Sequence, residues 1–121
     1  MGLDMYAFTT QSEIPAVDFD APEDRSELHY WRKHPDLHGW MKTIYRAKGG
    51  SNESFNCVPV RLDKADLDRL EQAVKTCALP HTEGFFFGRS DGTETPDDLE
   101  FIHKARDALA GGMRVYYWSW W

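Results

Sequence analysis

Two kinds of periodicity alternate along this chain, and their alternation constrains the fold more than any other feature of the sequence. Segments of alternating polarity, typical of strands, are separated by three segments whose apolar residues recur every three or four positions, typical of helices. The strand-like segments are short and are not continuously apolar. This pattern predicts an α+β fold, with a small antiparallel or mixed sheet of four to five short strands and three helices packed against it.

The expected strands are bounded by turn residues and by a long polar segment. Residues 11–25 are polar and acidic and contain two prolines, which predicts a surface loop. Pro59 lacks an amide hydrogen, so the strand that contains it should lie at an edge or form a bulge. We expect strands over residues 3–9, 27–32, 56–62, 84–88 and 113–121.

The three expected helices carry recognisable start and stop signals. The first should begin at Pro35 and end at Gly49-Gly50, and the second should begin after Asp63 as N-cap and end before Leu79-Pro80. The third should begin with Thr95 as cap and Pro96 at the first helical position. The side chains expected to face the core are Leu37, Trp40, Met41, Ile44, Leu67, Leu70, Val74, Cys77, Leu99, Ile102, Ala105 and Leu109.

Composition narrows the class of protein. A chain of 121 residues with 41% hydrophobic and 28% charged residues predicts one globular domain over residues 1–121. The formal net charge of −6 makes nucleic acid an unlikely ligand, because phosphate binding requires a basic excess. The sequence shows no apolar stretch long enough to span a bilayer and no basic leader followed by an apolar run, so we expect no membrane association and a cytoplasmic location with reduced thiols.

Polar and aromatic side chains concentrate just before and within the first expected helix. The cluster contains Tyr30, Trp31, Arg32, Lys33, His34 and His38. Cationic groups beside a helix N-terminus predict an anion or partner contact, because free backbone N–H groups point the same way. His34 and His38 supply only two metal ligands, so we expect neither a metal nor another cofactor.

The C-terminal residues are unusually aromatic. Large rings fall on both faces of the last expected strand, and Trp118 and Trp120 share one face. The face that does not join the core should be covered by another element or form an interface. We expect this edge to bind an unidentified protein partner, a second copy of the chain being one alternative.

Two further segments are assigned structural roles. The Gly84–Gly88 segment is expected to pack its phenylalanines into the core rather than to stack on nucleobases. Residues 89–92 are expected to form a turn, and neither Ser90 nor Cys77 is assigned as a nucleophile.

Four blocks of this sequence, in order, resemble a family of small uncharacterised phage and prophage proteins. They are Gly2-Leu3-Asp4-Met5-Tyr6, then Tyr30-Trp31-Arg32-Lys33 with Leu37-His38 and Trp40, then Leu79-Pro80 with Gly84-Phe85-Phe86-Phe87-Gly88, and finally Tyr116-Tyr117 with Ser119 and Trp121. The acidic, proline-containing loop after the first strand and the extra Trp118 and Trp120 depart from the family pattern.

The resemblance implies a phage or prophage setting, and it implies no reaction. It favours an accessory protein that acts as a protein-interaction module, for example an inhibitor of a host enzyme or defence system. The alternative is a small enzyme or ligand-binding protein for a phosphorylated or anionic compound at the Arg32–His38 cluster.

Overall fold

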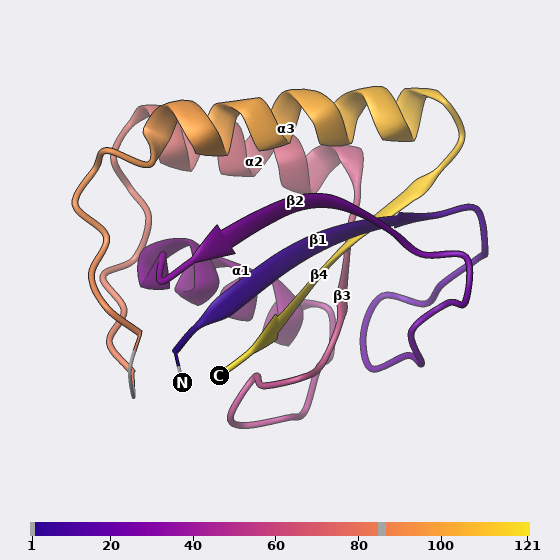
Figure 1. Ribbon diagram of the computed structural model, residues 1–121, viewed down its shortest axis with the longest axis horizontal. Helices are drawn as coiled ribbons and strands as arrows, with labels where there is room; N and C mark the ends of the chain where they lie inside the picture. The colour runs from indigo at the N-terminus through magenta and orange to yellow at the C-terminus, as the bar shows by residue number, and fades with distance from the viewer. Residues whose placement is uncertain (1, 85–86) are drawn as a thin grey trace.

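A computed structural model describes residues 2–84 and 87–121 of the chain (Figure 1). In chain order the elements are β1 (Asp4–Thr10), β2 (Ser26–Arg32), α1 (Pro35–Ala47), β3 (Val60–Leu62), α2 (Lys64–Lys75), α3 (Thr95–Ala110) and β4 (Arg114–Trp120). The predicted α+β class is confirmed, since one antiparallel four-stranded sheet packs against three helices.

The strand order in the sheet is β2-β1-β4-β3. The first and last strands of the chain are therefore neighbours at the centre of the sheet, and the two termini lie close together in Figure 1. In the register, Asp4 on β1 stands opposite both Arg32 on β2 and Trp120 on β4. Residues far apart in the sequence thus share one sheet face.

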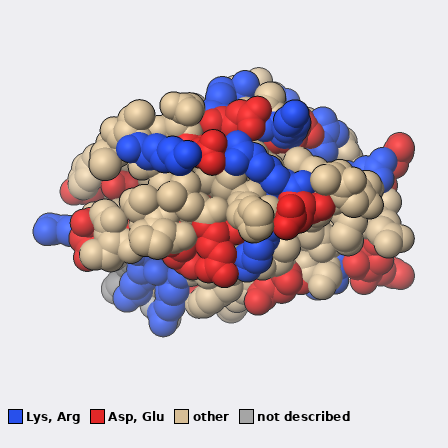
Figure 2. All heavy atoms as spheres, turned by 90° about the horizontal axis from the view of Figure 1, so that it is seen from above, with Lys and Arg blue, Asp and Glu red and all other residues tan. Residues whose placement is uncertain are grey.

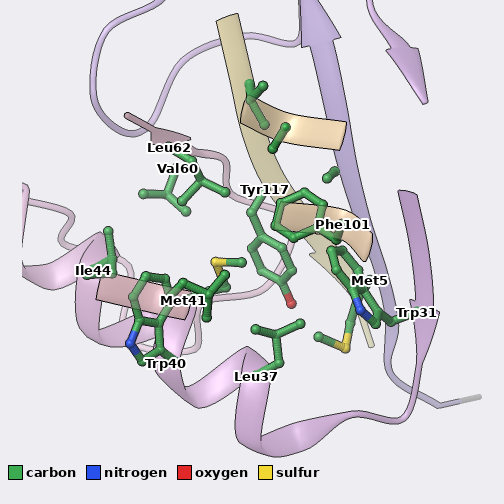
Figure 3. Close-up of a cluster of buried hydrophobic side chains, with 14 of the residues drawn as sticks. Met5, Trp31, Leu37, Trp40, Met41, Ile44, Val60, Leu62, Phe101 and Tyr117 are labelled. Atoms are coloured by element: carbon green, nitrogen blue, oxygen red, sulfur yellow. The ribbon is translucent and has the colours of Figure 1, made fainter. Parts of the chain in front are cut away.

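Alternation along the strands separates a buried face from an outer face. Met5 and Ala7 of β1 are fully buried, whereas Tyr6 and Phe8 between them are only partly buried. Tyr117 of β4 points inward to residues of α1, β1 and β2, as Figure 3 shows. The buried side chains form one continuous cluster to which all three helices contribute, so the helices lie on the same face of the sheet.

The helix starts are largely as predicted. Helix α1 begins at Pro35, and α2 begins after Asp63, whose amide donates to Asp66 Oδ2 at 2.8 Å. Helix α3 begins at Thr95, so the prediction that Thr95 is the cap was wrong by one residue and Glu94 is the N-cap. These starts depend on local capping, which explains why they can be predicted from spacing.

The predicted end of α2 was wrong. The helix stops at Lys75, and Cys77 lies beyond it, exposed and at φ 55° rather than on the buried helix face. The Ala78 amide donates to Ala73 O at 2.8 Å, which is the bond that closes a helix through a left-handed residue. The other predicted inward residues of α2 are buried: Leu67, Leu70 and Val74.

Two predicted strands also differ from the structure. The strand predicted over residues 56–62 is paired with β4 only over Val60–Leu62, although it lies at the sheet edge as Pro59 suggested. An isolated bridge from Val17 to Val60 attaches the 11–25 segment to its other side. In the segment predicted as a strand over residues 84–88, Gly84, Phe87 and Gly88 are not in a strand, and Phe85 and Phe86 lie outside the described residues.

The described residues contain no helix that is both long and apolar enough to cross a membrane. On the face seen in Figure 2, acidic and basic side chains are interspersed without a large patch of one sign. One mixed group joins α2 to α3, where Arg106 contacts Glu71 at 2.9 Å and Asp68 at 2.8 Å. This charge pattern adds no argument for nucleic-acid binding.

Candidate functional site

The sheet face that is turned away from the helices carries a continuous group of aromatic side chains. We call it the outer aromatic face, and it consists of Tyr6, Phe8, Tyr30, Tyr116, Trp118 and Trp120. Strand alternation places these residues on one side, and the antiparallel register aligns Tyr6 with both Tyr30 and Trp118. Three of the predicted site residues, Tyr30, Trp118 and Trp120, are therefore brought together by the sheet.

Ring contacts run across three neighbouring strands, β2, β1 and β4. Tyr6 lies 5.1 Å from Tyr30 and 5.9 Å from Trp118 between ring centroids, and Phe8 lies 5.3 Å from Tyr116. At the end of this group, Trp120 is 60% exposed and Tyr30 is 43% exposed. Among residues 2–84 and 87–121, these are the large hydrophobic side chains most open to solvent. An exposed aromatic group of this size is characteristic of an interface.

A hollow of about 320 Å³ adjoins the outer aromatic face. Phe8, Tyr116 and Trp118 line it from the sheet, and the 11–25 segment supplies Phe19 and Arg25 among its other walls. Phe19 packs edge-on against Tyr116 at 5.2 Å. Within the described part of the chain the buried Tyr116 hydroxyl has no hydrogen-bond partner. An unpaired buried polar group is unusual, and a bound group could satisfy it.

Polar residues border the face at the end where the termini meet. The Tyr30 hydroxyl donates to Asp4 Oδ1 at 2.6 Å, and Arg32 Nε lies 3.6 Å from the same oxygen. The hydrogen bond to Asp4, together with partial burial, raises the pKa of Tyr30 to about 12, so the phenol stays protonated at neutral pH. Arg32 thus belongs to the rim of the outer aromatic face.

The remaining predicted site residues are separated from that face. Trp31 is buried because it alternates with Tyr30 and Arg32 on β2 and points to the helices. Its indole Nε1 donates to Asp98 Oδ1 at 3.1 Å. His34 Nε2 lies 2.8 Å from Asp98 Oδ2, and His34 Nδ1 lies 2.6 Å from Ser90 Oγ. This hydrogen-bond network joins β2, the start of α1, the loop of residues 88–92 and the first turn of α3. The turn predicted over residues 89–92 is not formed there, since residues 89–91 are irregular and Gly92 is a bend.

His38 is also buried, one helical turn beyond His34. Its Nδ1 lies 2.7 Å from the Tyr117 hydroxyl, and its ring packs 5.0 Å from that of Phe55. Burial lowers the pKa of His38 to about 3, and the nearby charge of Lys42 adds to the effect. The buried His38 ring is therefore neutral, and its Nδ1 is hydrogen-bonded to the Tyr117 hydroxyl.

The predicted anion cluster does not converge on one point. Arg32 lies near Asp4 at the rim of the outer aromatic face, whereas His34 and His38 turn into two separate buried networks. The helix amide of Asp36, which an anion would have used, donates to Ser90 Oγ at 3.1 Å. Lys33 is exposed and has φ 55°. Strand alternation and the turn at Lys33 separate residues that are adjacent in sequence.

Ser90 and Asp98 were missed as site residues, although one sequence signal was present. Gly88-Arg89-Ser90-Asp91-Gly92 has the Gly-x-Ser-x-Gly spacing of many nucleophilic serines. No local signal marks Asp98, which contacts His34 across 64 residues. No three His, Cys, Asp or Glu side chains of residues 2–84 and 87–121 are grouped closely enough to hold a metal ion.

Comparison of the chain with protein-family models, with curated proteins and with solved structures gives no match. The functional argument therefore depends on the geometry of the chain itself.

Proposed function

We propose that this protein is a protein-interaction module that binds a partner protein through the outer aromatic face. The observation that carries the proposal is the position of Tyr30, Trp118 and Trp120 on a sheet face that no helix of the described residues covers. Tyrosine and tryptophan dominate the binding energy of many interfaces, because they bury large areas with few rotatable bonds.

The form of the surface supports this mode of binding. Its centre is aromatic, and Asp4 and Arg32 lie beside it as a charged rim. The adjoining hollow is large enough to take one side chain of a partner, and the Tyr116 hydroxyl would gain a hydrogen bond there. A pocket that accepts an anchoring side chain is a common centre for an interface.

The proposed setting follows from the resemblance described above. An accessory protein of phage or prophage type would act by occupying a surface of a host or phage protein. An inhibitor of a host enzyme or of a defence system is the form that we favour.

The test is capture of a partner by tagged protein from a lysate of the source cells. We expect one stoichiometric partner to be retained by the wild type and to be lost from Trp120→Ser and Tyr30→Ser. His103→Ala is the matched control, because its side chain is exposed on α3, across the molecule from this face. Hydrogen exchange of the complex should show protection at β1 and β4.

Capture that is equal for all four proteins, or a complex whose protection maps to the helices, would contradict the proposal. Sedimentation of the purified chain distinguishes a second copy from another partner. A dimer that dissociates on Trp120→Ser would identify the chain itself as the occupant of the face.

A further inference from the structure

A glycine-flanked serine lies at the mouth of a second hollow on the opposite side of the sheet. Gly88 and Gly92, at φ 76° and 90°, bracket Ser90 in the loop that precedes α3. Their left-handed conformations turn the chain sharply on either side of Ser90. The Ser90 side chain is thereby directed to the start of α1, where it meets His34 and the Asp36 amide.

The hydrogen-bond partners determine where the protons lie in this network. Ser90 Oγ accepts from the Asp36 amide, so its own hydrogen is free to be donated to His34 Nδ1 at 2.6 Å. His34 Nε2 then carries the ring hydrogen and donates to Asp98 Oδ2 at 2.8 Å. Ser90 is a hydroxyl facing a basic nitrogen, and Asp98 fixes the tautomer that makes this nitrogen basic. These are the roles of a nucleophile, base and orienting acid.

Asp98 is itself held in one orientation. It is 2% exposed, and its second oxygen accepts from Trp31 Nε1 at 3.1 Å. It also lies in the first turn of α3, where the helix dipole favours a carboxylate. Because the Asp98 carboxylate is held in place, it keeps the imidazole of His34 in the orientation that faces Ser90.

The hollow gives the serine access to a small ligand. Its volume is about 210 Å³, and Ser90, His34 and Asp98 line it together with the apolar side chains of Val74 and Leu79. This volume suits a short acyl group. Two further carboxylates, from the side chains of Asp36 and Glu94, also line the hollow. They disfavour anionic compounds, because like charges repel.

We propose that Ser90, His34 and Asp98 form an acyl-transfer site that hydrolyses short-chain neutral or cationic esters. Ser90 Oγ attacks the ester carbonyl carbon while its proton passes to His34 Nδ1. The alcohol leaves with that proton when the carbon–oxygen bond breaks, and the acyl group stays on Ser90. Water then attacks the acyl-serine with His34 as base, and its proton returns to Ser90 as the acid is released.

The start of α1 supports the same step. The Asp36 N–H donates to Ser90 Oγ, and the positive end of the helix dipole favours the negative charge that this oxygen gains as its proton passes to His34 Nδ1. The arrangement differs from the strand–turn–helix elbow of α/β-hydrolases, because Gly88 and the preceding Phe87 are not in a strand. The proposal therefore depends on the roles of the three side chains and not on that fold.

The experiment combines covalent labelling with hydrolysis. We expect a fluorophosphonate probe to modify Ser90, located by peptide mapping, and p-nitrophenyl acetate hydrolysis to fall about 100-fold or more in Ser90→Ala. Ser54→Ala is the matched control because Ser54 is an exposed serine away from the hollow. It should keep wild-type hydrolysis. A cationic choline ester should react faster than an anionic ester of equal acyl length.

Labelling needs only the folded wild-type chain, so the proposal can be tested even if Asp98→Asn or His34→Gln fails to fold. Absence of label on Ser90, or equal hydrolysis by wild type and Ser90→Ala, would overturn it. The three side chains would then serve only to join α1, α3 and β2. Neither result bears on partner binding by the outer aromatic face.

Discussion

The Tyr117 hydroxyl and Nδ1 of His38 form a hydrogen bond of 2.7 Å, although 79 residues separate the two in the chain. The bond joins β4, at the centre of the sheet, to α1 inside the core. Burial keeps the His38 ring neutral by lowering its pKa to about 3. Protonation of His38 is therefore linked to the stability of the fold.

The first prediction concerns this linkage. Between its unfolded pKa near 6.5 and its folded pKa of about 3, His38 binds a proton more strongly in the unfolded chain. The free energy of unfolding should therefore fall by roughly 1.4 kcal/mol for each pH unit below about 6. Denaturant unfolding at pH 7, 6 and 5 should show the loss, and His38→Gln should have a smaller slope. Identical slopes in the two proteins would exclude His38 as its source.

The second prediction concerns a buried ion pair between the end of α1 and the start of α2. Lys48 Nζ contacts Asp66 Oδ2 at 2.5 Å, and Asp66 also accepts from Arg69 and from the Asp63 amide. Burial by itself raises the pKa of Asp66, but these donors lower it overall. Lys48→Met should destabilise the protein by about 3 kcal/mol, because it removes one partner of a buried charge.

The control for this ion pair is Lys75→Met, since Lys75 forms a more exposed pair with Glu71 at 3.6 Å. Its loss should change stability by less than about 1 kcal/mol. An equal loss of unfolding free energy for Lys48→Met and Lys75→Met in chemical denaturation would contradict the buried ion pair of Lys48 with Asp66. The Asp66 contribution should be lost in acid, as pH falls through its lowered folded pKa.

The third prediction concerns the contact of α1 with the segment after α2. A Cβ at Gly39 would lie 1.9 Å from Thr82 Oγ1 and 2.9 Å from Thr82 Cβ. Gly39→Ala should therefore destabilise the protein, although alanine is normally better in a helix by about 1 kcal/mol. Adding Thr82→Ala to Gly39→Ala should partly restore the stability, because it removes Thr82 Oγ1, the closer of the two atoms. Thermal melts of the three variants test this, and a stabilised Gly39→Ala single variant would show that the two segments move apart freely.

The fourth prediction separates two residues of α3. Phe101 is fully buried and packs edge-on against Trp31 at 4.8 Å between ring centroids, whereas Leu109, predicted as core, is only partly buried. Phe101→Ala should cost about 3–5 kcal/mol because it leaves a cavity. Leu109→Ala should cost distinctly less. Denaturant midpoints measure both, and equal losses would mean that the end of α3 packs as tightly as its middle.

Much of the local structure could be predicted from the sequence. Pro35 and Asp63 mark the starts of two helices, and alternation on the first and last strands predicts which residues face inward. These features depend on neighbours within one or two turns, and such neighbours are visible in the spacing. The end of α2 was not predictable in this way, because Cys77 adopts a left-handed conformation that is ordinarily expected of glycine.

The candidate sites could be predicted from the sequence only in part. Tyr30 was predicted as a binding residue from the cluster before the first helix, and Trp118 and Trp120 from the aromatic content of the last strand. Their meeting on one face required the β2-β1-β4 order. The cluster from Tyr30 to His38 was predicted as one site and is divided among the outer aromatic face and two buried networks. Alternation of side chains on β2 explains the division, since neighbours in a strand point to opposite faces.

The sequence by itself determined most of the element types, the starts of α1 and α2 and the inward-facing residues of β1, because these follow from short-range periodicity and capping. Only the tertiary structure decided the strand order, the meeting of Ser90 with His34 and Asp98, and the bond from Tyr117 to His38. Such contacts join residues more than 50 positions apart, with separations of 56, 64 and 79. Their formation depends on how whole elements pack around the core, and no local spacing encodes that arrangement.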